Sequence, residues 1–532
     1  MTDAQALPNY RRPEVDVVVP DLTMIADILG GTRVMHTKAA TYIKKWPAEE
    51  PDIFKFRSTV ETVFEGLGRT LSAATGMLFS KSPQITWNKS EATITPHYDN
   101  LDNAGTKGSV LVKRFAEMAL RDGLAGNLVD HTPAPLGEDG NPVPVVTNKL
   151  AADFGLRPTW ALYARCQIIN WRTTVINNAR TLSLISLHEA AEVADGEYGI
   201  KAVHRWRVLK LILTPNGWQA TWRLFQSERE TSTEAGDFRV VGSGAFRNKA
   251  GQVAEFLPFS VAYTGRTDAP MTATIPLLGV AWANLAHWQQ STDLRCYRMV
   301  SAYPQPVVTG ELQKDATGMA KPLRLGPFVA VYLSDAAAKF GWAEITGTSM
   351  EQLEKGIAEK LGQMSVMGMS FMQKESRGVQ TAEATRLNAT AENSTLATAS
   401  QGIEDAINLS FEHHAWFVGI EKKDAPVMAI NREFESTLLD AQTMLAYVTA
   451  CKDAGLPIRV MLEMWDAGGR LPPGTDIVAL EDEMMANAEA AVQRLADANA
   501  AQAPPPSGNG KKPTKMTRKD KTGAVTDTFE LA

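Results

Sequence analysis

The stretch that decides the fold runs from residue 348 to residue 420, where TSMEQLEKGIAEKLGQMSVMGMSFM (348–372) is followed by QKESRGVQ (373–380) and TAEATRLNATAENSTLATASQG (381–402). Thr348 and Glu351 have the spacing of a capping box, which predicts that a helix starts there. Apolar residues then recur at steps of three and four and share one helix face: Leu353, Ile357, Leu361, Met364, Met367 and Phe371.

A polar break ends this apolar face. Its residues are Gln373, Lys374, Glu375, Ser376 and Arg377. Gly378 favours a left-handed stop, and Thr381 with Glu383 two residues later suits the start of a second helix. If the second helix reaches Trp416, the two arms are roughly 36 and 55 Å long at ~1.5 Å per residue.

The second helix is divided in composition. Its later half carries an ordinary core stripe of Leu396, Ala399, Ile403, Ile407, Phe411 and Ala415. Its earlier half carries small and hydrogen-bonding residues, among them Thr385, Asn388, Asn393 and Thr395. Such a face suits close contact with a neighbouring subunit or with water in a channel. A solvated helix face is the alternative interpretation.

Length and composition describe an ordinary globular chain. With 532 residues, 44% hydrophobic and 21% charged, it can form about two to four domain-sized units, which excludes disorder of the whole chain. Cys166, Cys296 and Cys451 lie far apart without CxxC spacing, which argues against a disulfide framework and a zinc site. We expect neither an export signal nor a membrane span.

The net charge of −6 lacks the basic character of a protein that reads DNA sequence. A DNA conduit has different requirements, because each cation paired with a phosphate adds affinity and would slow a moving duplex. A neutral or acidic channel wall is therefore compatible with DNA passing through. Mild acidity is also common among cytoplasmic proteins.

Outside the deciding stretch, periodicity predicts an α+β chain with a strand-rich part that begins near Trp160. Helices are expected at 22–29, 57–83, 108–121, from Pro276, and at 434–454, 459–467 and 481–501. Strands are expected at 124–131, 168–172, 182–187, 204–213, 218–225 and 253–261.

Several short segments, in the right order, resemble the portal proteins of tailed bacteriophages, and among them a branch catalogued as a domain of unknown function (DUF4055-like). These segments are TLSAATGMLFSKSP (70–83), RPTWALY (157–163) with QIINWR (167–172), the TAEA start at 381–384, NSTLAT (393–398) leading into IEDA (403–406), and GGRLP (468–472). The resemblance covers most of residues 57–475.

The resemblance implies a portal fold with an α/β wing, a helical stem, a short clip and a helical crown. The parts would be an arm and wing at 1–275, stem helices at 276–298 and 348–372, the clip at 299–347, a tunnel loop at 373–380, a long wing helix at 381–420, the crown at 421–502 and a disordered basic tail at 503–532. Gln373 to Arg377 would then face DNA, and Thr385, Asn388, Asn393 and Thr395 would face a neighbouring subunit. An ordinary surface turn is the alternative for the loop.

Portals form a ring, usually a dodecamer, at one capsid vertex of the virion, after assembly in the host cytoplasm. The resemblance therefore implies self-association and passage of double-stranded DNA without sequence specificity. It also implies contacts with the terminase large subunit, major capsid and scaffold proteins and a head-tail adaptor, with no membrane partner.

No catalytic, cofactor or metal constellation emerges from the sequence. His413 and His414 are adjacent, whereas a zinc protease needs two histidines one helical turn apart. Glu404 and Asp405 diverge around a helix, and GNGKK (508–512) lacks P-loop spacing. We therefore expect a structural protein that is not an enzyme and carries no cofactor. The alternative is a cytoplasmic, hydrolase-like enzyme whose site shows no motif.

Overall fold

The computed structural model describes residues 7–131, 154–215, 217–302, 305–309, 319, 339–343, 348–369, 382–432, 434, 448, 449, 451, 457–467, 471, 475–502, 515–519 and 525–530. The chain divides into two compact units, Met1–Phe434 and Glu435–Ala532, and each is described by itself. Both units mix helices and strands, so the chain is α+β as predicted.

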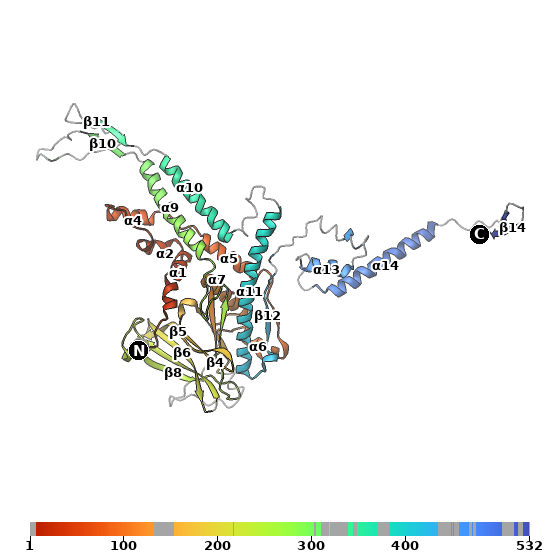
Figure 1. Ribbon diagram of the computed structural model, residues 1–532, viewed down its shortest axis with the longest axis horizontal. Coiled ribbons are helices and arrows are strands. Elements are labelled where there is room, and N and C mark those ends of the chain that lie inside the picture. The colour runs from red at the N-terminus through yellow and green to blue at the C-terminus, as the bar shows by residue number, and fades with distance from the viewer. Residues whose placement is uncertain are drawn as a thin grey trace. The chain divides into compact units, whose positions relative to one another are not determined.

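The body of the first unit holds two antiparallel sheets with helices packed beside them (Figure 1). Its helices are α1 (Pro13–Leu29), α2 (Gly31–Thr37), α3 (Ala39–Tyr42), α4 (Pro51–Thr59), α5 (Gly66–Leu78), α6 (Glu91–Tyr98) and α7 (Gly108–Asp122). Its strands are β1 (Gln84–Thr86), β2 (Leu124–His131), β3 (Pro158–Ala164), β4 (Ile168–Ile176), β5 (Ala179–Asp195), β6 (Gly199–Thr214), β7 (Gly217–Ser227), β8 (Arg239–Ala245) and β9 (Phe259–Tyr263).

The larger sheet has the order β4-β5-β6-β7-β8, and the smaller has the order β3-β2-β9. One core joins them to the helices. Phe115 of α7, Leu128 of β2, Leu209 of β6 and Phe411 of a later helix are almost fully buried in this core. The left-handed Gly123, with φ of 84°, turns the chain directly from α7 into β2.

Two helices project from the body side by side: α9 (Leu278–Ala302) and α10 (Thr348–Met364), here called the stem helices (Figure 1). A strand pair lies at their far end, formed by β10 (Gln305–Thr309) and β11 (Lys339–Ala343). A π-helical turn, Ser365–Met369, follows α10. The long helix α11 (Ala382–Val418) returns along the body, and β12 (Val427–Ala429) pairs with β1.

The second unit contains α13 (Ile458–Ala467), α14 (Ile477–Gln502), β13 (Lys515–Lys519) and β14 (Val525–Glu530). Composition predicts no regular structure at 503–532, yet β13 and β14 form an antiparallel pair there. In the Cα register, Lys515 is opposite Glu530 and Arg518 is opposite Asp527.

Other predictions need correction in the body. The helix expected over 57–83 is divided, because α4 ends at Thr59 and α5 starts at Gly66. The helix expected at 22–29 begins at Pro13, which suits a first helical position because proline has no N–H to satisfy. The strand expected at 253–261 is confined to β9, after a single bridge between Val253 and Arg247.

Long periodic elements match the sequence better. α7 and β2 lie within two residues of their predicted bounds, α9 starts two residues after the predicted 276 and ends four residues after the predicted 298, and α11 ends at Val418, close to the expected Trp416. The helix expected at 481–501 begins earlier, at Ile477, where Asp476 accepts hydrogen bonds from Val478 N and Ala479 N. Most of 434–454 lies outside the described residues. No described helix is both long and apolar enough to cross a lipid bilayer.

Candidate functional site

The first stem helix is fixed to the body by a buried amide. Asn284 Oδ1 accepts a hydrogen bond from Leu67 N at 3.0 Å, and Asn284 Nδ2 donates to Phe64 O at 2.9 Å. Trp288 is fully buried one turn further along α9, and its indole N–H donates to Glu61 O at 3.3 Å. These bonds satisfy backbone groups where the chain enters α5, so α9 and α5 hold each other in place.

A buried charge cluster adds a second attachment. Arg57 is 2% exposed and bonds Glu49 at 2.8 Å and Asp293 of α9 at 3.0 Å, with its guanidinium 4.0 Å from the Trp46 ring centroid. The hydrogen bond from Arg57 holds the pKa of Glu49 below its ordinary value. Burial raises the pKa of Asp293 against the opposing pull of Arg57.

The second stem helix runs antiparallel to the first. Arg298 near the end of α9 pairs with Glu354 near the start of α10, at 2.8 Å. At the other end, the Gly368 position lies against α9 and α5, where a Cβ would be 2.6 Å from Val280 Cγ2 and 2.8 Å from Thr70 Cγ2. Only glycine fits there without displacing these side chains.

The stem leaves apolar side chains uncovered. Trp282 of α9 is 53% exposed, and Val366 and Met367 of the π-helical turn are 73% and 47% exposed. The π-helical turn lies close to α9 here, since Met367 Sδ is 3.2 Å from the position that a Cβ on Gly279 would take, and Gly279 is one turn before Trp282. Trp342 on β11, at the far end, is 54% exposed. Large apolar side chains that stay exposed near one another mark a candidate contact site.

The predicted apolar face of α10 is therefore only partly covered. Met364 is fully buried as expected, but Leu361 and Met367 remain more than a third exposed. Phe371 lies outside the described residues.

The predicted channel residues Gln373, Lys374, Glu375, Ser376 and Arg377 lie outside the described residues. The predicted contact residues Thr385, Asn388 and Asn393 fall within the first half of α11, and their side chains are also outside what the structure describes. Thr395 is exposed on the same helix.

The second half of α11 is held against the smaller sheet. Gly402 passes so close to β9 that a Cβ would lie 2.0 Å from Tyr263 O, which requires glycine. Two turns later, the buried Ser410 hydroxyl receives a hydrogen bond from Asn127 Nδ2 at 2.9 Å and lies 2.6 Å from Ser260 Oγ. The core stripe predicted for this half of the helix is confirmed by the burial of Ala399, Ile403, Ile407, Phe411 and Ala415.

The chain that follows α11 binds back to it. Asn408 makes two backbone bonds to Met428, donating to its carbonyl at 3.1 Å and accepting from its N–H at 2.8 Å. Glu404 accepts from Ile430 N at 3.0 Å and pairs with Arg432 at 2.8 Å. Glu404 thus has a structural partner, and this half of α11 is a rigid support.

His414, near the end of α11, and His97 of α6 are uncharged and lie within hydrogen-bond distance of each other. Trp160 donates its indole N–H to His414 Nδ1 at 3.3 Å, so the proton of His414 is on Nε2, which donates to His97 Nδ1 at 3.0 Å. Burial lowers the pKa of His97 to about 4 and that of His414 well below its ordinary value. This chain of bonds joins α6, β3 and α11 across the core.

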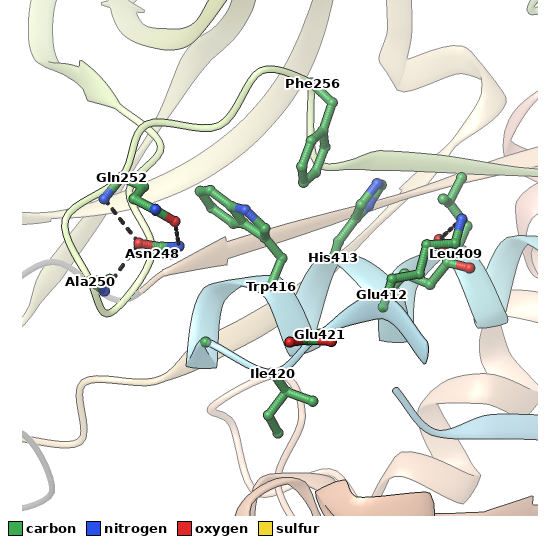
Figure 2. Close-up of a pocket in the computed structure, with 12 residues that line it drawn as sticks. Asn248, Ala250, Gln252, Phe256, Leu409, Glu412, His413, Trp416, Ile420 and Glu421 are labelled. Atoms are coloured by element: carbon green, nitrogen blue, oxygen red, sulfur yellow. Dashed lines mark hydrogen bonds and ion pairs between the residues drawn. The ribbon is translucent and has the colours of Figure 1, made fainter. Parts of the chain in front are cut away.

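A pocket of ≈ 560 Å³ opens beside His413 and Trp416 (Figure 2). Both side chains extend from one face of α11 toward Phe256, whose ring stacks on His413 at 4.9 Å. Burial lowers the pKa of His413 to about 3, and its Nδ1 has no hydrogen-bond partner. The lowered pKa makes this imidazole a weak base, and the lining residues include no serine, threonine or cysteine nucleophile for it to activate.

Among the described residues, no group of three or more His, Cys, Asp or Glu side chains is placed to hold a metal ion. The three cysteines are free thiols. Local sequence patterns did not predict the bonds of Asn284 to Leu67, of Arg57 to Asp293 and of Asn127 to Ser410, because in each case the partners lie more than 200 residues apart.

Comparison with known proteins gives one family profile and many chains of solved structures. A family profile described as "Domain of unknown function (DUF4055)" matches residues 276–418, which include α9, α10 and α11. This is the branch that the sequence resembles. No curated protein matches the chain.

One of the solved structures is titled "Neck of empty GTA particle computed with C6 symmetry". The match covers 81% of this chain and 97% of the other, with 10% identity and a TM-score of 0.34. A TM-score of this size is too low to carry an inference about fold or function.

Proposed function

We propose that this protein is the portal of a tailed bacteriophage: a ring, most simply a dodecamer, at one capsid vertex, through which double-stranded DNA enters during packaging and leaves during ejection. The observation that carries the proposal is the projecting pair of stem helices with uncovered apolar side chains at its base. Trp282, Val366 and Met367 form a surface that one copy of the chain leaves open to water.

The family match supports the proposal because it spans the helices to which the portal resemblance assigns the stem and the long wing helix. On this mapping, 276–298 and 348–372 are the stem, 299–347 the clip, 381–420 the long wing helix and 421–502 the crown. The clip would contact the terminase large subunit during packaging and the head-tail adaptor afterwards. Capsid and scaffold proteins would surround the wing. The role is structural, and the ATP-driven motor is another protein.

Residues 373–380 would form the tunnel loop. Lys374 and Arg377 against Glu375 give each loop a small positive excess. A circle of such loops would touch phosphates through weak contacts that salt screens, enough to centre a duplex and too weak to hold it. Thr385, Asn388, Asn393 and Thr395 would meet the neighbouring subunit behind the loop.

Imaging of the purified full-length protein tests the ring. Negative-stain particles with a central hole and a dodecameric mass by mass photometry are expected. A small oligomer without a hole would contradict the proposal.

A charge reversal tests the tunnel loop within assembled particles. Lys374→Glu with Arg377→Glu should leave rings and capsids intact while shortening the packaged genome or reducing its retention. Lys113→Glu with Arg114→Glu, two exposed cations on α7, is the matched control and should package normally. Full-length DNA in the loop variant would show that the segment is an ordinary turn.

A further inference from the structure

Strands β5 and β6 extend beyond the rest of the larger sheet. β4 pairs with β5 only as far as Leu187, and β7 pairs with β6 only from His204 onward. β5 and β6 nevertheless continue to pair with each other to Asp195 and Gly199. Residues 189–203 are therefore a two-stranded ribbon that pairs with no further strand among the residues that the structure describes.

The end of this ribbon is acidic and carries exposed apolar side chains. Tyr198 is 90% exposed and Ile200 is 69% exposed, next to a turn at Gly196 with φ of 77°. Glu192, Asp195 and Glu197 are exposed around them. A two-stranded ribbon alone is marginally stable in water, so this one gains from a partner that covers Tyr198 and Ile200.

A hollow of ≈ 600 Å³ lies on the outer face of the same sheet. Arg172 of β4, Lys210 of β6 and Arg223 of β7 line it, all three exposed, and the lining includes no carboxylate. The register brings them together, because Arg172 is opposite Leu184, which is opposite Lys210, and Arg223 is opposite Val208. Their charged groups make no hydrogen bond or ion pair within the described part of the chain.

Between the cations, the hollow presents apolar side chains. Leu184, Val208 and Ile212 lie on the same face, with Phe225 beside them. The N-terminal segment forms one wall, where Ser186 Oγ donates to Pro8 O at 3.0 Å. The hollow therefore offers an apolar floor with a positive rim, complementary to a ribbon that has apolar anchors and a negative rim.

A subunit's own ribbon does not reach its own hollow. At about 3.3 Å per residue, Asp195 lies roughly 36 Å along β5 from Leu184, and both belong to one continuous strand. Two different complementary patches on one chain produce a head-to-tail contact, which closes into a ring when the rotation between copies permits.

We propose that the acidic ribbon of one subunit, residues 189–203, docks into the basic hollow of the next subunit around the ring. The inference rests on the proposed ring and names one of its contacts. Asp195 and Glu197 meet Lys210 and Arg223 of the neighbour, while Tyr198 and Ile200 cover Leu184 and Val208. A second copy is favoured over nucleic acid as the occupant, because the hollow has an apolar floor and every copy carries a ribbon of matching charge.

Charge reversal in full-length protein tests the contact. Lys210→Glu with Arg223→Glu should abolish rings, and Asp195→Lys with Glu197→Lys should abolish them too. The four substitutions together should restore rings, because the charges again oppose each other. Mass photometry measures the ring fraction, and circular dichroism with thermal melting shows that each variant is folded.

Arg180→Glu with Arg239→Glu is the matched control, since it reverses two exposed cations of the same sheet outside the hollow and should leave rings intact. Persistent rings in both two-site variants, or folded protein without rescue in the combined variant, would overturn the inference. If the Lys210/Arg223 variant still forms rings but binds a DNA duplex less tightly in a mobility-shift assay, the hollow is a DNA-binding site. That result would also overturn the inference. An absence of rings in the parent would instead contradict the proposed function.

Discussion

The two stem helices lie side by side but differ in what supports them. α9 is enclosed by α1, α4 and α5 along much of its length and buries Val280, Ala281, Leu285 and Trp288. α10 packs mainly on α9, and among its side chains that the structure describes only Met364 is buried. The comparison teaches that α9 is stabilised within one chain, whereas α10 and the π-helical turn after it leave surface for a second one.

The largest expected difference in unfolding free energy is between the alanine variants of two tryptophans on α9. Trp288→Ala should lower the free energy of unfolding by about 3–5 kcal/mol, because it leaves a large cavity and removes the bond to Glu61 O. Trp282→Ala is the matched control, and because Trp282 is 53% exposed its cost should stay near ~0.5 kcal/mol. Urea unfolding of assembly-deficient monomers measures both, and equal costs would refute the contrast.

Two arginines that form ion pairs at the stem give the next effect, Arg57 of α4 with Asp293 of α9 and Arg298 of α9 with Glu354 of α10. Arg57→Ala leaves Glu49 and Asp293 without their partner in a buried site and should cost about 3 kcal/mol. Arg298→Ala removes an exposed pair with Glu354 and should cost ~0–1 kcal/mol. The contrast is measured by urea unfolding, and a small loss for Arg57→Ala would mean that α9 is not fixed by the charge cluster.

Removal of the Asn284 side-chain amide tests how much a single residue stabilises the contact between α9 and α5. Asn284→Ala orphans Leu67 N and Phe64 O and should cost about 1–3 kcal/mol. Gln363→Ala on α10 removes only an exposed bond to Lys360 and should be almost neutral. Hydrogen exchange at the Leu67 amide would report the loss directly, and unchanged protection would contradict the assigned role.

These contrasts also show what the sequence could predict. The helical repeat of Leu278, Ala281, Leu285 and Trp288 predicted α9 and its buried side, because apolar periodicity is a local signal. The repeat in α10 predicted the helix but not that Leu361 and Met367 stay exposed, since a contact surface and a core have the same pattern. The break at 60–65 was missed because apolar side chains continue through it, and the ribbon at 189–203 became visible only through strand registers.

Acid should loosen α9 by a smaller amount. Burial lowers the pKa of His287, so the folded chain takes up this proton at a lower pH than the unfolded chain, whose histidine is protonated below a pH of about 6.5. Its contribution is therefore complete above that pH and declines as pH falls. His287→Phe should reduce the proton uptake on unfolding at pH 5 by up to one proton. Unfolding free energies of the parent and the variant at pH 7 and pH 5 measure this difference. An unchanged pH dependence in the variant would contradict the assigned role of His287.

The smallest effect on stability should accompany a large effect on assembly. Val366→Lys with Met367→Lys changes exposed residues and should alter the free energy of unfolding of the monomer by less than about 0.5 kcal/mol per site. In a ring, the same lysines would meet an apolar neighbour and lose their hydration, which should prevent closure. Lys355→Ala, also on α10, is a control variant purified in the same way, and it should still form rings.

Mass photometry of the parent beside the Val366→Lys/Met367→Lys variant tests the central claim most directly, that the surface left open by the stem is where copies of this chain meet in a ring. The account predicts a dodecameric parent and a folded monomeric variant with the parent's unfolding free energy. A parent that stays monomeric, or a variant that assembles as the parent does, would contradict it.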